Sequence, residues 1–491
     1  MLAGSVAASA AAAARALFPG PALGATTPAS SAVEVAIVGA GAAGIAAARK
    51  IAAAGRRYVL IEATDHIGGR CITDTTTFGM PYDRGAHWLY LPDTNPLTKL
   101  APNRGDIYPA PRSQKVRIGR RFAREGELED FLSVQVRAMR AINDLARKSD
   151  APCEQAIPAD LGDWKPTVEF VLGPWNCAKD LPQVSSFDFA KATEHKTAAF
   201  GKLGLGTVLA SLARGLNVQL STPASAIDTR NGVSIVTGKG TINARTAIVT
   251  VPTNVISSGG LKFVPELEHH QFDTFGRLSL GSFDHIALEL KGNPLGLDSD
   301  DLVFEKSSDS RTAALLANIS GTPLCMVDVA GAFGRDLSAK GEADMFAFAT
   351  DWLVNLYGAE IKNAIGRRHA TRWNNEPYAL GAWSAAGPGG QFTRKQLLGT
   401  LTYNVWYAGE AAHETLWGTL GGAWESGERA ADAALRAVGG LKPLAPEASQ
   451  SDTVTQGKAK RAKTERRPSR YGESYGGPSY TGTPNIMGRE R

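Results

Sequence analysis

The sequence lacks the residues and runs that several classes of protein require. It has four cysteines among 491 residues, Cys71, Cys153, Cys177 and Cys325, and no two of them form a C-x-x-C pair. This spacing indicates neither a zinc site nor a dense disulfide framework, so we expect buried thiols and no bound metal. After the first thirty positions, no apolar run reaches the roughly 20 residues that span a membrane.

The body of the chain also lacks an excess of charge. The formal net charge is +5, and positions 451–491 alone hold nine basic against four acidic residues. That tail accounts for the whole excess, so the body offers no basic face to nucleic acid. Positions 441–491 are rich in Pro, Gly, Ser, Lys and Arg, which predicts a disordered basic tail. Positions 458–470 would suit nucleic acid or anionic lipid, but a solvated tail is the simpler interpretation.

The first 32 positions predict a signal-like or disordered segment. An Ala-rich apolar run is broken by Pro19 and Pro21, and small residues follow at positions 24–25. An export signal requires a basic region before the apolar run, and this sequence has none there. The segment resembles the later half of a bacterial twin-arginine signal, which implies a periplasmic protein. The alternative is a disordered extension of a cytoplasmic enzyme, and both locations stay open.

A dinucleotide-binding fold is predicted to begin at Val33. Positions 33–38 form a β-branched apolar run, a glycine-rich turn follows, and a helix-forming stretch then continues to position 54. In this pattern Gly39 permits the tight turn, and Gly41 lets a pyrophosphate approach the backbone. Gly44 lets helix and strand pack closely.

Further residues after the turn indicate which nucleotide is bound. The helix that starts at Ala42 and Ala43 offers its free N–H groups and positive dipole end to phosphates. The next apolar run ends at Glu62, which is placed to accept hydrogen bonds from the adenosine ribose. Gly69 and Arg70 follow, where simple NAD dehydrogenases have no matching element. This segment resembles the G-G-R segment of flavin-containing amine oxidases, in which it contacts the phosphates of FAD.

Further blocks resemble the same family, in its bacterial type, over most of positions 33–437. Positions 82–89 are similar to its D-x-G-x-x-W segment, and positions 373–384 to its W-x-x-(D/E)-P-Y-x-x-G-x-(Y/W)-S stretch. Positions 407–427 resemble its closing strand and helix, whose N-terminus points at the flavin. The resemblance implies that Glu410 binds the ribityl or phosphate region. The other residues that it assigns to FAD are Gly85, Ala86, His87, Trp88, Ala224, Trp373, Gly409, Thr419 and Leu420.

The resemblance implies an α/β fold in which a Rossmann-type FAD-binding domain is interleaved with an α+β substrate domain. Helical spacing at positions 128–146 and 345–356 suits the wall of the substrate domain. Trp352 and Tyr357 are interpreted as core residues. The expected FAD-binding segments are 33–110, 201–265 and 399–440, and the expected substrate segments are 111–200 (mainly helical) and 266–398.

Two positions depart from the family pattern at the flavin. His285 stands where many relatives place a lysine that holds a water against flavin N5. A histidine could hold the same water in a pH-sensitive way, or it could be a strand histidine satisfied by a backbone carbonyl. Ala382 stands where some relatives bind FAD covalently through a cysteine, so non-covalent FAD is expected.

The substrate positions differ from both monoamine and polyamine oxidases. Trp383 matches one of the two aromatic residues that frame the amine in monoamine oxidases. Thr419 occupies the other position, as in polyamine oxidases and related histone demethylases. Tyr90 stands where polyamine enzymes tend to place an acidic residue or histidine. A small aromatic or heterocyclic amine fits Trp383, Tyr90 and Trp417 better than a polyamine, although Trp417 could equally serve in packing.

The predicted reaction is the oxidation of an amine. A hydride passes from the carbon next to an uncharged nitrogen to flavin N5, and the imine then hydrolyses to a carbonyl product. His285, Trp383 and Tyr90 are the candidate catalytic residues. Oxygen, with release of peroxide, or a cytochrome-type protein would accept the electrons, and a homodimer stays open. The alternatives are an FAD-dependent desaturase or C–C oxidising flavoprotein, and a non-catalytic FAD-bound interaction module.

Overall fold

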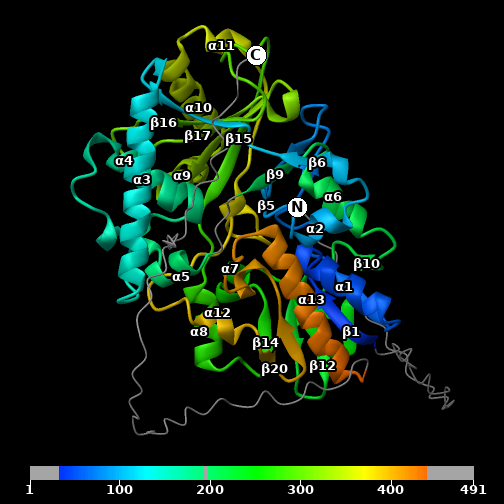
Figure 1. Cartoon of the computed structure of the whole chain (residues 1–491). Coiled ribbons are helices and arrows are strands. Elements are labelled where there is room, and N and C mark those ends of the chain that lie inside the picture. Colours follow the sequence, from blue (N-terminus) through cyan, green and yellow to red (C-terminus); the bar gives the residue numbers. More distant parts are fainter. Residues whose placement is uncertain (1–32, 193–196, 440–491) are drawn as a thin grey trace, which may run out of the picture. The chain divides into compact units, whose positions relative to one another are not determined.

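The computed structural model describes residues 33–192 and 197–439. The expected signal-like segment and basic tail lie outside the described residues. Within the described ranges, the strands form a nine-stranded sheet, a seven-stranded sheet and two small sheets, with helices packed around them (Figure 1). This is a mixed α/β architecture, as expected.

The nine-stranded sheet has a parallel centre and an antiparallel flank. Strand β1 pairs in parallel with β2 and β13, and β13 pairs in parallel with β21. The flank is antiparallel because β12 joins β11 to β13. The strands are β1 (Val33–Val38), β2 (Tyr58–Ile61), β10 (Val218–Gln219), β11 (Ala224–Asp228), β12 (Val233–Thr237), β13 (Gly240–Val249), β14 (Lys262–Val264), β20 (Thr400–Thr402) and β21 (Val405–Tyr407).

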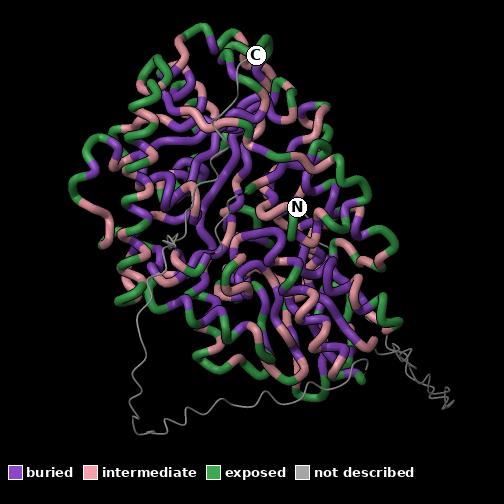
Figure 2. Tube along the Cα trace, in the orientation of Figure 1, coloured by how far each residue is buried: buried purple, intermediate pink, exposed green. Residues whose placement is uncertain are grey.

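Both faces of this sheet are covered, so its central strands are apolar on both sides. In β1, Val35 and Ile37 pack towards helices α1 (Ala42–Ala53) and α13 (Leu420–Ala437). Ala36 and Val38 face the opposite cluster, which contains residues of α8 (His269–Arg277). Figure 1 shows α1 and α13 side by side, and Figure 2 shows the buried chain along the sheet.

The seven-stranded sheet carries the second core. Its strands follow the order β19-β15-β18-β17-β16-β7-β8. Successive side chains of β15 point to opposite faces of the sheet. Ile286 and Leu288 pack on helices α9 (Gly331–Lys340) and α10 (Glu342–Tyr357), whereas His285 and Ala287 point to the other face. The strands are β7 (Ser113–Ile118), β8 (Arg121–Phe122), β15 (Phe283–Leu290), β16 (Asp301–Glu305), β17 (Ala314–Ala317), β18 (Leu324–Ala330) and β19 (Ile365–Ala370).

The distribution of strands follows the expected interleaving of segments. All strands of the nine-stranded sheet fall within positions 33–110, 201–265 and 399–440, and those of the seven-stranded sheet within 111–200 and 266–398. The exact domain boundaries stay a prediction. The small sheets pair β3 (Thr73–Asp74) with β4 (Tyr82–Asp83), and β9 (Ala198–Gly201) with β5 (Leu89–Tyr90) and β6 (Ile107–Pro109).

The helices predicted from spacing are present and slightly longer than expected. Helix α3 covers Glu125–Ala146, and α10 contains the whole of positions 345–356. Trp352 is buried in the core under α10 and Tyr357 packs against it, which confirms their interpretation as core residues. The remaining helices are α2 (Pro96–Leu100), α4 (Lys165–Phe170), α5 (Ser186–Lys191), α6 (Leu205–Leu212), α7 (Thr253–Ser257), α11 (Ile361–Ala364) and α12 (Thr393–Gln396).

The four cysteines are free and buried, as predicted. In residues 33–192 and 197–439, no helix is long and apolar enough to cross a membrane. The same ranges contain no cluster of histidine, cysteine, aspartate and glutamate side chains that could hold a metal ion.

One buried lysine bonds only neutral partners. Lys179 is 6% exposed, and its Nζ donates to Ser279 Oγ at 2.9 Å and to the Ala385 carbonyl at 2.6 Å. Burial and the nearby positive charge of Arg394 lower the pKa of Lys179 from 10.5 to about 8, although Asp188 opposes the shift. The native protein therefore carries an incompletely compensated cation at neutral pH.

This lysine makes stability depend on pH. The native state releases the Lys179 proton near pH 8, whereas the unfolded chain keeps it up to pH 10.5, so the cost of the buried charge disappears as the pH rises through this window. We expect the free energy of unfolding of the wild type to rise by up to about 3 kcal/mol relative to Lys179→Met between pH 7 and pH 10.5. Urea unfolding followed by tryptophan fluorescence measures this difference. Lys362→Met, at an exposed position, is the control, and parallel pH curves for wild type and Lys179→Met would contradict the assignment.

Candidate active site

A cavity of about 590 Å³ collects the residues that the sequence analysis singled out. Segments of both large sheets line it. Of the residues assigned to the cofactor or to catalysis, only Gly44 does not line the cavity. The assigned residues that do are Gly39, Gly41, Ala42, Ala43, Glu62, Gly69, Arg70, Gly85, Ala86, His87, Trp88, Tyr90, Ala224, His285, Trp373, Trp383, Gly409, Glu410, Thr419 and Leu420.

The glycine turn forms one end of the cavity, between β1 and α1. Gly39 has a φ of +104°, which disfavours any residue with a side chain. A Cβ at Gly44 would lie 1.8 Å from the Gly39 carbonyl oxygen, so this glycine permits the close packing of helix and strand. Gly41 is the N-cap of α1, and it provides no side-chain hydrogen bond to the first turn. The backbone N–H groups there fit a pyrophosphate.

Glu62 lies beside this turn at the end of β2. Its carboxylate is buried and accepts a hydrogen bond from the Ala40 N–H at 2.7 Å. Its other oxygen accepts from both the N–H and the hydroxyl of Thr64, each at 3.0 Å. These bonds fix the carboxylate at the cavity wall next to the helix N-terminus, which fits the place of an adenosine ribose.

Arg70 and Glu410 form an ion pair further along the cavity. Arg70 donates to Glu410 Oε1 at 3.1 Å and also to the Ala382 carbonyl. Glu410 further accepts from the Ser384 N–H at 3.1 Å, the Ser384 hydroxyl at 2.7 Å and the Gly418 N–H at 2.9 Å. Protein donors thus use the roughly four lone-pair directions of the carboxylate. These bonds hold the cavity wall together, and the expectation that Glu410 binds the ribityl or phosphate group stays a prediction.

The N-terminus of α13 reaches the same region. Thr419 caps the helix, because its Oγ1 accepts from the Gly422 N–H at 3.0 Å. Gly418 precedes it with a φ of +71°, and a Cβ there would lie 2.8 Å from the Trp383 ring. Thr419 and Leu420 therefore present the positive end of an 18-residue helix to the cavity.

Aromatic side chains line the other end of the cavity. Trp88 and Tyr90 stack with ring centroids 6.3 Å apart, and Trp88 meets Trp175 edge-on at 5.7 Å. Phe283 and Trp383 pack at 4.9 Å. All five side chains line the cavity.

Trp417 has the packing role that the sequence left open, and its role toward the substrate stays a prediction. It lines the cavity, and at 6% exposure it is also part of the apolar core beneath α3. The guanidinium of Arg394 lies 5.0 Å from the centroid of its ring, on the side of the buried core.

His285 has both ring nitrogens engaged. Its Nδ1 lies 2.6 Å from Asp328 Oδ1 on β18, and its Nε2 lies 3.0 Å from the Gly85 carbonyl oxygen. Both partners are acceptors, so the ring donates from both nitrogens as an imidazolium. Burial opposes this charge, but Asp328 and the Gly85 carbonyl raise the pKa of His285 above 6.5. The backbone-carbonyl alternative describes the Gly85 contact, and the water-holding role of His285 stays a prediction.

Comparison with protein families identifies the chain. The family of flavin-containing amine oxidoreductases matches residues 184–435, more than half of the sequence, and an NAD(P)-binding Rossmann-like domain matches residues 37–101. The chain belongs to the flavin-containing amine oxidoreductase family. Its cofactor is FAD, and it is a flavin-dependent oxidoreductase that acts on amines.

Individual relatives agree with this membership. Polyamine oxidase 4 of Oryza sativa subsp. japonica is 25% identical over 439 residues, which cover 81% of this chain and 88% of the relative. Lysine-specific histone demethylase 2 of Homo sapiens is 24% identical over 436 residues, covering 81% of this chain and 53% of that protein. A structure of a putrescine oxidase double mutant with redesigned cofactor binding shares the fold, with a TM-score of 0.69 at 17% identity, over 82% of this chain and 99% of that one.

The cavity of this flavin amine oxidase holds no reactive thiol among its described lining residues. Ala382 lines the cavity at the position where some relatives carry a cysteine, and its carbonyl accepts from Arg70. Cys71 is the cysteine of the described lining, which the sequence analysis did not foresee. Burial raises the pKa of its thiol far above 9, so the thiol stays protonated and unreactive. This chemistry suits non-covalent FAD.

Four more residues in or behind the site were missed from the sequence. Trp175 ends a π-helical turn (Val171–Trp175), for which no periodic pattern exists. Asp328 and Arg394 are distant in sequence from the groups they bind. Phe283 could have been found, because it lies two residues before His285 and therefore on the same face of the strand.

The glycine packing can be tested by a single methyl group. Gly44→Ala would place its Cβ 1.8 Å from the Gly39 carbonyl, so the turn must move away from the position that fits the pyrophosphate. We expect purified Gly44→Ala to lose most of its bound FAD, measured as the ratio of absorbance at 450 and 280 nm. Gly126→Ala, where nothing lies within 4 Å, is the matched control and keeps its FAD. Full flavin content in Gly44→Ala would show that the turn does not need this contact.

The charge on His285 can be tested through its partner. In Asp328→Asn the carboxylate that raises the pKa of His285 is gone, and burial lowers the pKa instead. As the pH rises through 6.5, the wild type keeps the imidazolium and the variant loses it. Histidine Cε1 NMR titration, with His285→Gln for assignment, measures the shift. Glu425→Gln, which removes the partner of His413, leaves His285 unchanged. An unmoved His285 titration in Asp328→Asn would refute the assignment.

Proposed function

We propose that this flavin amine oxidase oxidises a small monoamine with an aromatic or heterocyclic body. The observation that carries the proposal is the chemistry of the cavity end bordered by Trp88, Tyr90, Trp175, Phe283 and Trp383. The rings of these five residues line the cavity and pack against one another in pairs. Such walls bind a flat apolar body and favour the uncharged amine over a polycation.

The reaction balances as a two-electron oxidation. The C–H bond next to nitrogen breaks, its electron pair leaves with the hydrogen as hydride, and the nitrogen lone pair forms a C=N bond while a proton leaves nitrogen. Bound FAD supplies the two-electron acceptor at N5, and O₂ takes the electrons as hydrogen peroxide. Water then adds to the imine and releases the carbonyl product and the amine fragment.

The residues of this chain contribute positioning and exclusion of water. Trp383 and Phe283 form one wall against the substrate, and Tyr90 with Trp88 forms another. His285 binds the Gly85 carbonyl and so holds the 85–88 segment, which lines the cavity, in place. We therefore assign His285 a positioning role in place of a water-holding one.

A polyamine substrate, suggested by the names of several relatives, is poorly supported by the charges of this cavity. Its carboxylates are Glu62, Asp65, Glu376 and Glu410. Glu62 and Asp65 lie next to the glycine turn, and Glu376 lies before the Tyr378 segment. Glu410 is already bonded to Arg70, Ser384 and Gly418. Glu410 lies beside the Trp383 segment, but its oxygens are occupied by these protein donors, so it has little to offer a polyamine chain.

The yield of hydrogen peroxide identifies the electron acceptor. We propose O₂ as the acceptor, with one peroxide formed per amine oxidised. A yield far below one in air, restored to full turnover by a cytochrome, would identify a protein acceptor instead.

The substrate class is tested by anaerobic reduction of the flavin. We expect 2-phenylethylamine and similar arylalkyl amines to bleach the 450 nm band in stopped flow, at least about 100-fold faster than putrescine or spermidine at equal concentration. The rate should rise with pH as the free amine forms. Trp383→Ala should slow the reaction about 10-fold or more through lost packing, whereas Tyr403→Ala, an exposed aromatic outside the cavity, should not. Faster bleaching by polyamines would overturn the substrate proposal, and no bleaching by any amine would overturn the reaction.

A further inference from the structure

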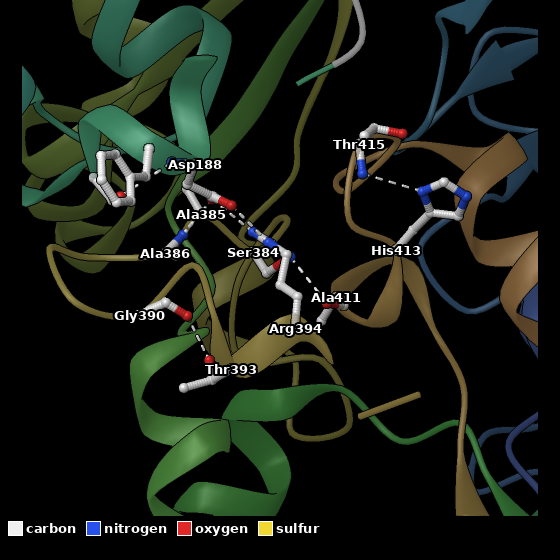
Figure 3. A network of polar contacts seen from close by, with 12 residues as sticks. Asp188, Ser384, Ala385, Ala386, Gly390, Thr393, Arg394, Ala411, His413 and Thr415 are labelled. Carbon is white, nitrogen blue, oxygen red and sulfur yellow. Dashed lines mark hydrogen bonds and ion pairs between the residues drawn. The ribbon is translucent and has the colours of Figure 1, made fainter. Parts of the chain in front are cut away.

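A fully buried ion pair lies directly behind the cavity wall. Asp188 on α5 and Arg394 on α12 are both 0% exposed. Arg394 Nε and Nη2 donate to the two oxygens of Asp188, each at 2.7 Å, and the Ala386 N–H also donates to Asp188. Figure 3 shows Arg394 reaching from this carboxylate towards Ser384 and Ala411. Two of the three guanidinium nitrogens of Arg394 thus bind Asp188, and Nη1 remains for other partners.

The remaining nitrogen of Arg394 determines how the Ser384 hydroxyl points. Arg394 Nη1 donates to Ser384 Oγ at 3.1 Å and to the Ala411 carbonyl at 2.9 Å. A guanidinium has no acceptor and stays charged, so it cannot receive the hydroxyl proton. The hydroxyl must therefore direct its single proton elsewhere, and Glu410 Oε2 lies 2.7 Å away. The two hydrogen bonds therefore have a fixed order, in which Arg394 donates to Ser384 and Ser384 donates to Glu410.

Glu410 transmits this order to the cofactor end of the cavity. Its carboxylate pairs with Arg70, which lines the cavity next to Gly69, and accepts from the Gly418 N–H just before α13. Ala411, the next residue, is held by the same Arg394 nitrogen. Three segments that border the cavity therefore depend on one buried guanidinium.

We propose that Arg394, held by Asp188, is a positioning residue for FAD: through Ser384 it fixes Glu410, and through Glu410 it fixes Arg70 and the start of α13. The inference rests on the proposed function, in which FAD occupies the cavity that Arg70 and Glu410 line. It assigns a role to Asp188 and Arg394, which lie outside the motifs of the sequence, and to Ser384, the last residue of the stretch at positions 373–384.

The test breaks the route while leaving the ion pair intact. Ser384→Ala removes the hydroxyl that connects Arg394 to Glu410. Ser186→Ala is the matched control, because Ser186 is equally buried and its hydroxyl also donates once and accepts once, to Ser149 and from Ala151, away from the cavity. The readout is the rate of FAD release from the diluted holoenzyme, followed by the recovery of flavin fluorescence, with the melting temperature of the apoprotein beside it.

We expect Ser384→Ala to release FAD about 10-fold faster or more, as the loss of a hydrogen bond to a charged group predicts, while its apoprotein melts like that of Ser186→Ala. Arg394→Lys keeps the charge beside Asp188 but lacks the planar fork that reaches Ser384 and Ala411 together, so it should also speed release. Glu410→Gln separates the two possible failures. Fast release from Glu410→Gln with release from Ser384→Ala and Arg394→Lys at the control rate would overturn the positioning route alone. Unchanged release from Glu410→Gln would overturn both this route and the place of Glu410 beside FAD.

Discussion

The cavity depends on the buried pair of Asp188 and Arg394, which joins segments 206 positions apart in the chain. Moving two charges out of water costs several kcal/mol for each ion, and mutual attraction repays this only when the geometry is good and the remaining polar atoms are bonded. Here Arg394 donates to Asp188 twice and also to Ser384 and Ala411. Loss of one partner alone would leave a buried charge, at a cost of about 3–5 kcal/mol. The pair therefore restricts how α5, α12 and the segment after β21 can be arranged.

The features predicted correctly from the sequence are those whose cause is local. Gly39, Gly44 and Glu62 belong to one strand–turn–helix–strand unit, in which a positive φ, a close approach and a strand end each require a particular residue type. Trp383 and Thr419 belong to later motifs that are also continuous in sequence, and both line the same cavity. The expected roles of these residues toward FAD remain predictions, because geometry alone locates them without testing what they bind.

The contacts that were missed are long-range. His285 and Asp328 lie on neighbouring strands 43 positions apart, and nothing near His285 in the sequence reveals that a carboxylate faces it. With that partner unknown, a free imidazole that holds water was a reasonable expectation; with it, both ring nitrogens are occupied. The donors of Glu410 were hidden in the same way, because Arg70 and Ser384 come from separate segments. Pairing across a fold is set by sheet register and loop packing, which composition and spacing do not encode.

The distribution of charge supports our proposal that the cavity holds an anionic cofactor and favours a neutral substrate. The cations Arg70 and His285 and the N-terminus of α13 all lie at the wall, where they favour the phosphates and the negative charge that develops when the cofactor accepts electrons. Arg70 and His285 are each partly neutralised by one carboxylate, Glu410 and Asp328. Those carboxylates are consequently unavailable to a cationic substrate. Under the proposed function, the aromatic side chains of the wall then favour an amine with a flat apolar body.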